Sequence, residues 1–417
     1  MRLRSPALVA AAAAALALSV STTGAASSSA APAPGIASAT GSYVVLLDDD
    51  VAARTVSALH ADRLGLELGH VYSSAIQGYS ASMSPTTAAL VASLPGVASV
   101  TADTPVAATA QSTPTGIDRA NADASPTAAI DGTDQRVDVD VAVIDTGVDL
   151  DHPDLNVNTA GAKNCTLFGI GSADDQNGHG THVSGTIGAK DDANGVVGMA
   201  PGARIWPVKV LGAAGTGLNS DVICGIDYVA AHADEIEVAN MSLGGGGEDD
   251  GDCGATNGDA MHAAICEAVA NGVTFVVAAG NDSADAAEST PAAYDEVVTV
   301  SALADFDGQP GGGAASTCRA DEDDTFASFS NYGDDVDIIA PGVCITSTWM
   351  NGGYDTISGT SMAAPHVAGG AALYAATHPS ATPAQVQAAL ESAGSSDWDA
   401  SDDPDDTKEP LLDVTGW

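Results

Sequence analysis

The chain has 417 residues, of which 45% are apolar and only 4% aromatic, so its core must be packed largely from Ala, Val and Gly. It carries 55 acidic and 12 basic residues, a net charge of −43, and almost all of the acidic excess follows residue 110. This charge excludes nucleic acid and anionic membranes as partners, because both require a basic face. Three explanations of the charge stay open: a solvated coat for concentrated salt, several calcium sites, or a genome that prefers Asp over Lys.

The first 26 residues have the pattern of a secretory signal peptide. Two arginines precede an apolar stretch over residues 7–20, and small residues follow as far as Ala26. The apolar stretch is too short to span a membrane. We expect cleavage after Ala26, with Ala30 as the alternative, and a secreted, extracellular product without an anchor. Residues 27–41 are mostly Ser, Ala and Pro and are predicted to be a linker.

Residues 42–106 have the pattern of a small α+β domain. Extended runs are expected at residues 43–47, 71–83 and 97–106, and helices at residues 51–68 and 86–94. This order predicts a split βαβ unit of the ferredoxin-like kind. An unrelated N-terminal domain or a poorly folded spacer is the alternative.

Three short segments place an Asp, a His and a Ser beside glycines. Asp145 ends a run with the pattern of a buried strand, and His179 and Ser361 each begin a helix-like run after a Gly. Such residues can meet at the carboxyl ends of parallel strands. A serine nucleophile needs an imidazole to take its proton and a carboxylate to orient that imidazole, so the set predicts a nucleophilic hydrolase. Taken singly, each residue could be a cap or a turn residue. His182 lacks a zinc signature around it and is expected to be a packed histidine or one that supports the site through a neighbouring residue.

Alternating apolar runs in the rest of the chain predict an α/β fold, with a mostly parallel sheet and helices on both faces. These runs are residues 205–211, 220–232, 236–241, 261–271 and 273–279, followed by a last surface helix at 383–393.

The order of the three residues and their surroundings resemble the subtilisin-like serine proteases over most of the chain. Asp145-Thr-Gly, His179-Gly-Thr-His and Gly359-Thr-Ser-Met-Ala-Ala-Pro are similar to the three signatures of that family. A Gly-x-Ser-x-Gly elbow does not surround the serine, because Ala363 stands where the second Gly would be. The resemblance implies a three-layer α/β sandwich over residues 110–417 with serine endopeptidase activity through an acyl-enzyme.

Two further segments are similar to the substrate-binding strands of that family. They contain Ser242, Leu243 and Gly244, and Ala278, Ala279 and Gly280. Peptide substrates would add to both segments main chain to main chain, which tolerates many sequences. The resemblance gives Asn281 the role of donor to the oxyanion, and a simple turn-forming Asn is the alternative.

The resemblance also implies that residues 42–109 are an inhibitory prodomain, which restrains the enzyme until it is removed. The segment from Ala110 to Gly116 resembles the start of mature subtilisins, so we predict self-cleavage between Thr109 and Ala110. Proteins and peptides are then the substrates, the prodomain is an intramolecular inhibitor, and we expect a monomer.

A structural calcium ion is a further implication of the resemblance, since oxygen ligands from side chains and backbone suit this cation. The matching positions are the side chains of Gln111, Asp154 and Asp192 and the carbonyls of Lys190, Asn194 and Val196. A solvated Asp-Asn turn is the alternative. Other acidic clusters, at residues 305–308, 321–324 and 397–406, lack a complete calcium-loop pattern and are expected to be solvated surface.

Six cysteines in an exported chain favour disulfides over catalytic or metal-binding thiols. Six cysteines allow 15 pairings, and free buried thiols are the alternative. We expect the pairs Cys165–Cys224, Cys253–Cys266 and Cys318–Cys344.

Substrate preference depends on the pocket that receives the residue before the cut. Tyr294 resembles a family position beside this pocket and puts Ala293 near its floor, so we expect a roomy apolar pocket and broad specificity for aromatic or aliphatic residues. A dibasic-specific processing protease is one alternative, and it would need carboxylates in the pocket. A non-catalytic binding protein on a protease scaffold is the other, although every expected active-site residue is present.

Overall fold

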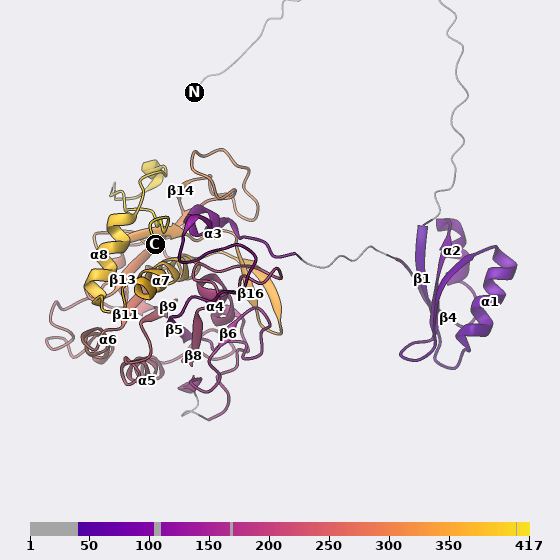
Figure 1. Ribbon diagram of the computed structural model, residues 1–417, viewed down its shortest axis with the longest axis horizontal. Coiled ribbons are helices and arrows are strands. Elements are labelled where there is room, and N and C mark those ends of the chain that lie inside the picture. Colours follow the sequence, from indigo (N-terminus) through magenta and orange to yellow (C-terminus); the bar gives the residue numbers. More distant parts are fainter. Residues whose placement is uncertain (1–40, 104–109, 167–169, 406) are drawn as a thin grey trace, which may run out of the picture. The chain divides into compact units, whose positions relative to one another are not determined.

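The computed structural model describes residues 41–103, 110–166, 170–405 and 407–417 (Figure 1). The predicted signal peptide, nearly all of the predicted linker, and Thr109 of the predicted cleavage site lie outside these ranges. The chain divides into two compact units, residues 1–107 and 108–417. No helix among the described residues is long and apolar enough to cross a bilayer.

The smaller unit is an antiparallel sheet with two helices, in the chain order βαββαβ. The strand order across the sheet is β2-β3-β1-β4, which is the ferredoxin-like arrangement predicted from the sequence. Buried residues such as Val45, Tyr79 and Val91 form its core. Its elements are β1 (Gly41–Leu47), α1 (Ala53–Leu64), β2 (Glu67–Tyr72), β3 (Gly78–Met83), α2 (Pro85–Ala92) and β4 (Val97–Ala102).

Two boundaries in this unit differ from the sequence prediction. Helix α1 ends at Leu64 because Gly65 adopts the left-handed conformation, with φ 65°, that commonly ends helices. The residues that follow start strand β2 instead of extending the helix. The predicted extended run at 71–83 is divided, since β2 ends at Tyr72 and β3 starts at Gly78.

The larger unit is built on a nine-stranded sheet in which the described strand pairs are parallel, except for β13 with β14. The order is β14-β13-β11-β9-β5-β8-β6, with β15 beside β13 and β7 beside β8. The strands are β5 (Asp140–Asp145), β6 (Asn156–Val157), β7 (Lys163–Asn164), β8 (Arg204–Lys209), β9 (Val238–Met241), β11 (Thr274–Ala278), β13 (Val298–Ala304), β14 (Thr325–Phe326) and β15 (Ile338–Pro341). Two small antiparallel sheets pair β10 (Gly245–Gly246) with β12 (Ser289–Thr290), and β16 (Ile345–Trp349) with β17 (Gly353–Ile357).

Helices cover both faces of the large sheet, as predicted. Because side chains alternate along a strand, Val141 and Val143 of β5 belong to one core layer, and Ala142 and Ile144 belong to the other. The first layer contains residues of α4, α7 and α8, and the second contains residues of α5 and α6. The three-layer α/β fold is therefore confirmed. The helices are α3 (Thr115–Arg119), α4 (His179–Gly188), α5 (Asn219–Ala230), α6 (Ala260–Ala270), α7 (Thr360–Thr377) and α8 (Pro383–Ala393).

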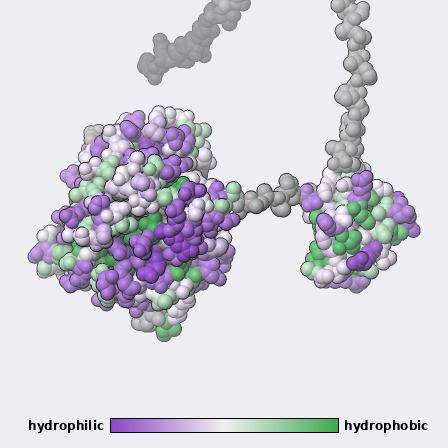
Figure 2. All heavy atoms as spheres, viewed as in Figure 1, coloured by the Kyte–Doolittle hydropathy of each residue, from purple (hydrophilic) through white to green (hydrophobic). Residues whose placement is uncertain are grey.

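Small residues allow close packing of the central helix α7, which is buried along most of its length. A Cβ added to Gly369 would lie 2.3 Å from the Cβ of Met199, so the helix approaches its neighbour closely at this point. The scarcity of aromatic residues in the sequence is thus matched by a core of Ala, Val and Gly. Hydrophilic residues cover much of the visible face of this unit (Figure 2).

The strand order creates a crevice at the carboxyl end of β5. The chain leaves β5 through α4 to reach β8 on one side, and then passes through α5 to β9 on the other side. Ligand sites of doubly wound sheets lie where the order reverses in this way. Asp145 is the last residue of β5 and lies at this point.

The six cysteines form the three expected disulfides, Cys165–Cys224, Cys253–Cys266 and Cys318–Cys344. None of them is left as a free thiol.

Candidate active site

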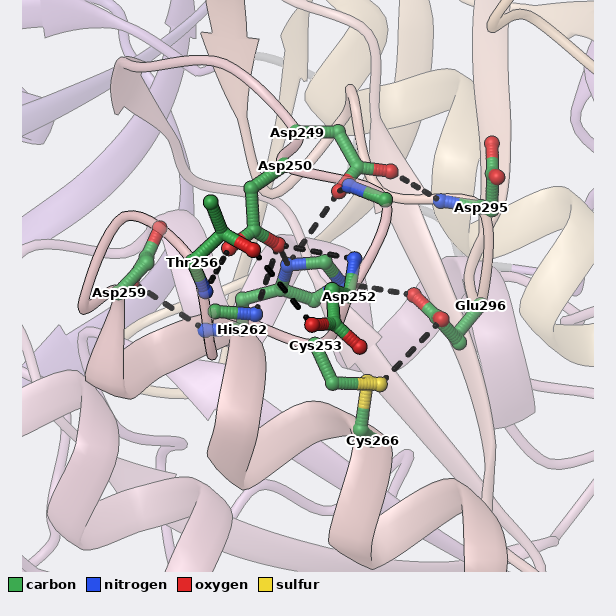
Figure 3. The surroundings of a disulfide bond; sticks show 12 residues. Asp249, Asp250, Asp252, Cys253, Thr256, Asp259, His262, Cys266, Asp295 and Glu296 are labelled. Carbon is green, nitrogen blue, oxygen red and sulfur yellow. Dashed lines mark hydrogen bonds and ion pairs between the residues drawn. A yellow bond between two sulfur atoms is a disulfide. The ribbon is translucent and has the colours of Figure 1, made fainter.

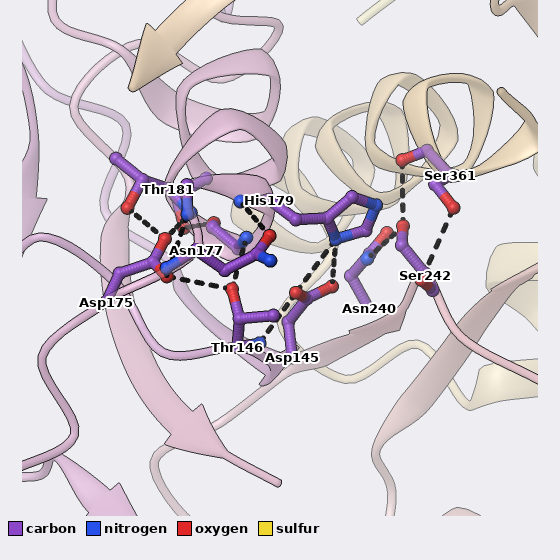
Figure 4. A network of polar contacts seen from close by, with 12 residues as sticks. Asp145, Thr146, Asp175, Asn177, His179, Thr181, Asn240, Ser242 and Ser361 are labelled. Carbon is purple, nitrogen blue, oxygen red and sulfur yellow. Dashed lines mark hydrogen bonds and ion pairs between the residues drawn. The ribbon is translucent and has the colours of Figure 1, made fainter. Parts of the chain in front are cut away.

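Asp145 and His179 form a hydrogen-bonded pair at the crevice (Figure 4). Nδ1 of His179 lies 2.8 Å and 2.9 Å from the two carboxylate oxygens of Asp145. A carboxylate only accepts hydrogen bonds, so Nδ1 carries the proton and Nε2 is the ring nitrogen left to act as a base. Asp145 is fully buried, whereas a quarter of the His179 side chain is exposed.

The environment of His179 tunes its basicity in two opposing ways. Burial acts to lower the pKa of His179, but the charge and hydrogen bond of Asp145, together with the charge of Asp175, outweigh burial and raise it. A raised pKa makes the ring a better proton acceptor near neutral pH.

Ser361 lies in the first turn of α7, and its hydroxyl donates a weak hydrogen bond of 3.3 Å to the carbonyl of Ser242. In return, the Ser242 hydroxyl donates to the Ser361 carbonyl at 2.9 Å. The second bond has a clear origin: Pro365 has no N–H to offer the carbonyl four residues before it, so that carbonyl is free to accept from outside the helix. The proline therefore helps to fasten the serine to the end of β9.

Asn281 has its side-chain orientation set by the same helix. Its Oδ1 accepts from the backbone N–H of Thr360 at 2.8 Å and from the Thr360 hydroxyl at 3.1 Å. The oxygen must face these donors, so the Nδ2 group points away from them, and Asn281 is among the residues that line the second of the cavities described below. The first-turn N–H groups of α7 add a positive field at the same place.

A supporting network around Asp175 was not predicted from the sequence. Its carboxylate accepts from the hydroxyls of Thr146 at 2.9 Å and Thr181 at 2.6 Å. It also accepts from the backbone N–H groups of Asn177, Gly178 and Thr181, and so it orders the start of α4. Lys209 adds a buried cation that donates to the carbonyl of Thr146. The only sequence signal for this network was its position just before the His179 motif.

Two adjoining cavities, of about 600 and 500 Å³, open at this edge of the sheet. Both are lined by Ser361 and by residues 243–246, and the first is also lined by His179. The six residues predicted to bind substrate line one cavity, the other, or both: Ser242, Leu243, Gly244, Ala278, Ala279 and Gly280.

The second cavity differs in detail from the expected subsite. Ala292 lines it, whereas Tyr294 is buried and donates a hydrogen bond of 2.5 Å from its hydroxyl to Asp259. Tyr294 therefore supports the α6 region. Neither Tyr294 nor Ala293, which was expected near the floor of the pocket, is among the residues that line these two cavities. Two exposed carboxylates, Asp282 and Glu288, also line this cavity.

The predicted calcium residues meet at one place. The backbone N–H of Gln111 donates to Ala193, and Ser112 pairs with Val196, so the segment after the predicted cut lies on the loop that contains Asp192. Oδ2 of Asp154 accepts from the N–H of Val196 at 3.0 Å, while its buried Oδ1 has no hydrogen-bond partner. An unsatisfied buried carboxylate oxygen beside a loop of carbonyls fits a cation.

Some members of the predicted set have other contacts. Oε1 of Gln111 accepts from Ala193 at 2.7 Å, and Nζ of Lys190 donates to the Pro153 carbonyl at 2.6 Å. The side chain of Asn194 turns back to Asp192. The unpredicted Asp191, which is buried, accepts from Nε2 of Gln111 at 2.8 Å.

The expectation that the other acidic clusters are solvated surface is wrong in part. Asp305, Asp323 and Asp324 are buried, and Arg119 forms ion pairs of 3.0 Å with Asp305 and 2.8 Å with Asp324. Asp403 in the tail is also buried. A buried cation and backbone N–H groups compensate the first group, and neither is visible in the local sequence.

His182 is a packed residue, as expected. It is fully buried, its Nε2 contacts the Ile345 carbonyl at 2.9 Å, and burial lowers its pKa to about 4.

Comparisons with known proteins agree over both units. A sequence profile of the Subtilase family matches residues 137–410, and one of Peptidase inhibitor I9 matches residues 42–109. The chain is 40% identical over 338 residues to an extracellular serine proteinase of Thermus sp. (strain Rt41A), covering 78% of this chain and 74% of that protein. It is 39% identical over 301 residues to subtilisin E of Bacillus subtilis (strain 168), and this match covers 72% of this chain and 70% of subtilisin E. Among solved structures, the crystal structure of a cold adapted subtilisin-like serine proteinase is similar, with a TM-score of 0.55 and 35% sequence identity. The match covers 72% of this chain and 97% of that chain.

Proposed function

The chain belongs to the subtilase family and is a subtilisin-like serine proteinase, and we propose that Asp145, His179 and Ser361 are its catalytic triad. The observation that carries this proposal is the bonded Asp145–His179 pair at a cavity that Ser361 also lines. We further propose that it is secreted and cleaves within polypeptides.

The reaction would begin when the Ser361 hydroxyl turns from the Ser242 carbonyl to Nε2 of His179. Its 3.3 Å bond is long for O–H···O and costs little to break. As Oγ attacks the scissile carbonyl carbon, Nε2 takes its proton, and Asp145 stabilises the imidazolium. The Nδ2 group of Asn281 and the N-terminus of α7 would donate to the oxyanion. His179 then protonates the leaving amine. In the second half, His179 takes a proton from water, whose oxygen attacks the acyl carbonyl carbon, and then returns that proton to Oγ of Ser361 as the ester bond breaks and the acid product leaves.

A fluorophosphonate probe tests the assignment of the nucleophile. The processed wild-type protein should be labelled once, at Ser361, and Ser361→Ala should lose both labelling and hydrolysis. Ser316→Ala, at an exposed serine outside both cavities, serves as the control and should keep both. Failure of the correctly processed wild type to react would support the non-catalytic binding protein.

For specificity we propose a broad preference for apolar residues before the cut, because Ala278, Ala279 and Ala292 line the second cavity. Asp282 and Glu288 favour a second candidate, cleavage after basic residues. A peptide library separates the two. If the second is correct, Glu288→Gln should reduce kcat/KM selectively on peptides with Lys or Arg before the cut, and the exposed Asp334→Asn should not.

We also propose that residues 42–109 are an intramolecular inhibitor and that the enzyme cuts between Thr109 and Ala110. The match to the inhibitor profile and the pairing of Ser112 with Val196 support this boundary. Ser361→Ala made in a host without proteases should remain at precursor size. Mature-size protein from that preparation would contradict self-processing.

A calcium ion at Asp154 is the proposed structural cofactor. Asp154 and Asp192 would supply side-chain oxygens, and the carbonyls of Lys190, Asn194 and Val196 would complete the set with Gln111. The bound ion would supply positive charge to carboxylates that otherwise repel each other. Burial raises the pKa of Asp154 to about 6, which the ion would oppose.

A further inference from the structure

An acidic loop and a buried histidine meet close to the disulfide between Cys253 and Cys266 (Figure 3). Asp249 and Asp250 follow strand β10, and His262 lies in the first turn of α6. The side chain of His262 is completely buried, and those of Asp249 and Asp250 are only 17% and 6% exposed. None of these residues has a part in the proposed hydrolysis.

The contacts of His262 determine which ring nitrogen carries a proton. Nε2 lies 2.8 Å from a carboxylate oxygen of Glu296, so Nε2 is the donor of that bond. Nδ1 points instead at Asp249 and Asp250, and this buried atom has no hydrogen-bond partner. A neutral ring would aim its lone pair at two carboxylates, which is unfavourable unless a positive charge lies between them.

Either a proton or a metal ion can supply that charge, and the distances favour the metal. Nδ1 lies 3.4 Å from Oδ1 of Asp249 and 3.5 Å from Oδ1 of Asp250. N–H···O hydrogen bonds are usually about 2.7–3.2 Å long. Two ligands at about 2.0–2.1 Å from a tetrahedral zinc ion are separated by about 3.3 Å, close to the observed spacing.

The surroundings hold these groups in place without a metal. Asp250 accepts from the backbone N–H groups of four residues of its own loop. The His262 ring stacks on Tyr294 with 4.0 Å between ring centres. Glu296 then resembles the outer carboxylate that orients a metal-bound histidine. The nearby Cys253 and Cys266 are bonded to each other and offer no thiolate.

We propose that Nδ1 of His262 and the carboxylates of Asp249 and Asp250 bind a divalent transition-metal ion of the zinc class, with water in the remaining position. One nitrogen and two carboxylate oxygens suit such an ion better than calcium, which takes oxygen ligands. The metal would fasten the loop after β10 to α6. Because residues 245 and 246 of β10 line both cavities, it would steady one wall of the cleft.

The test is a zinc titration of the full chain with Ser361→Ala, which prevents self-digestion, in excess calcium so that oxygen sites are filled. A chromophoric chelator reports free zinc, and cobalt provides an independent readout through the intense visible bands of a tetrahedral site. The variants to compare are Asp249→Asn and Asp252→Asn. Both remove one charge from the same loop, but Asp252 is exposed and outside the trio.

Asp249→Asn should weaken zinc binding at least tenfold and abolish the cobalt bands, while Asp252→Asn leaves both unchanged. Glu296→Gln should weaken binding about 10–100-fold, as loss of an outer partner usually does. Circular dichroism checks that each variant is folded. Equal affinity of the wild type and Asp249→Asn would overturn the proposal. So would a ring that keeps protons on both nitrogens in excess zinc, detected by nitrogen NMR, because the proton would then be the occupant.

Discussion

Asn281 offers a way to separate catalysis from stability, since its two side-chain atoms face different partners. Oδ1 caps α7 through Thr360, and in the proposed mechanism Nδ2 would donate to the oxyanion. Asn281→Ala removes both functions. It should lower kcat about 10²–10³-fold, the effect known for this kind of change in subtilisin. Loss of the cap should cost about 1 kcal/mol of unfolding free energy, which is a fall of about 2–4 °C in Tm.

Asn281→Asp keeps the acceptor but places a negative oxygen where the oxyanion forms. Its Tm should equal or exceed that of the wild type, because an anion at a helix N-terminus adds about 0.3–1 kcal/mol. Its kcat should be at least as low as that of Asn281→Ala. The assay is hydrolysis of a chromogenic peptide, normalised by active-site titration, with Tm from calorimetry. A less than tenfold loss in Asn281→Ala, or wild-type activity in Asn281→Asp, would refute the assignment.

Four further predictions concern stability. Asp154→Asn should remove most of the rise in Tm on adding calcium, which for the wild type is worth about 2.7 kcal/mol at 100 times Kd; an unchanged rise would place the ion elsewhere. Burial raises the pKa of Glu409 to about 8, so the native state binds more protons than the unfolded state. The bound proton contributes its full stabilisation below a pH of about 4, and this contribution is lost as pH rises through 8. Tm measured in the presence of a chelator should therefore fall over this pH range, and it should fall less steeply for Glu409→Gln. Gly369→Ala should cost about 1–3 kcal/mol through the clash with Met199, whereas Gly416→Ala, with nothing within 4 Å, should be neutral in urea unfolding. Molar salt should raise Tm by screening the net charge of −43; a constant Tm would argue against adaptation to brine.

Local sequence was sufficient to predict the fold class and the elements on which the three candidate catalytic residues lie. The apolar run before Asp145 predicted a buried strand with the carboxylate at its end, and the glycines before His179 and Ser361 predicted helix starts. These features depend on residues close by in the sequence, so the spacing of apolar residues and the backbone preferences of glycine are enough to predict them. The resemblance to a known family added the role of Asn281, which no local pattern could provide.

Tertiary structure alone decided which charges are buried and what faces them. Asp305 and Asp324 belong to chain segments with the composition of a solvated surface. In the folded chain, however, both form ion pairs with Arg119, which belongs to a helix far away in the sequence. Likewise, the hydrogen bond between Ser242 and Ser361 joins residues far apart in the chain. The His262 ring and Asp249, which it faces, belong to separate elements. The sequence by itself determined the elements and the chemistry that the chain carries. Burial and pairing needed the folded structure, because the energy of a charge depends on the groups that packing places around it.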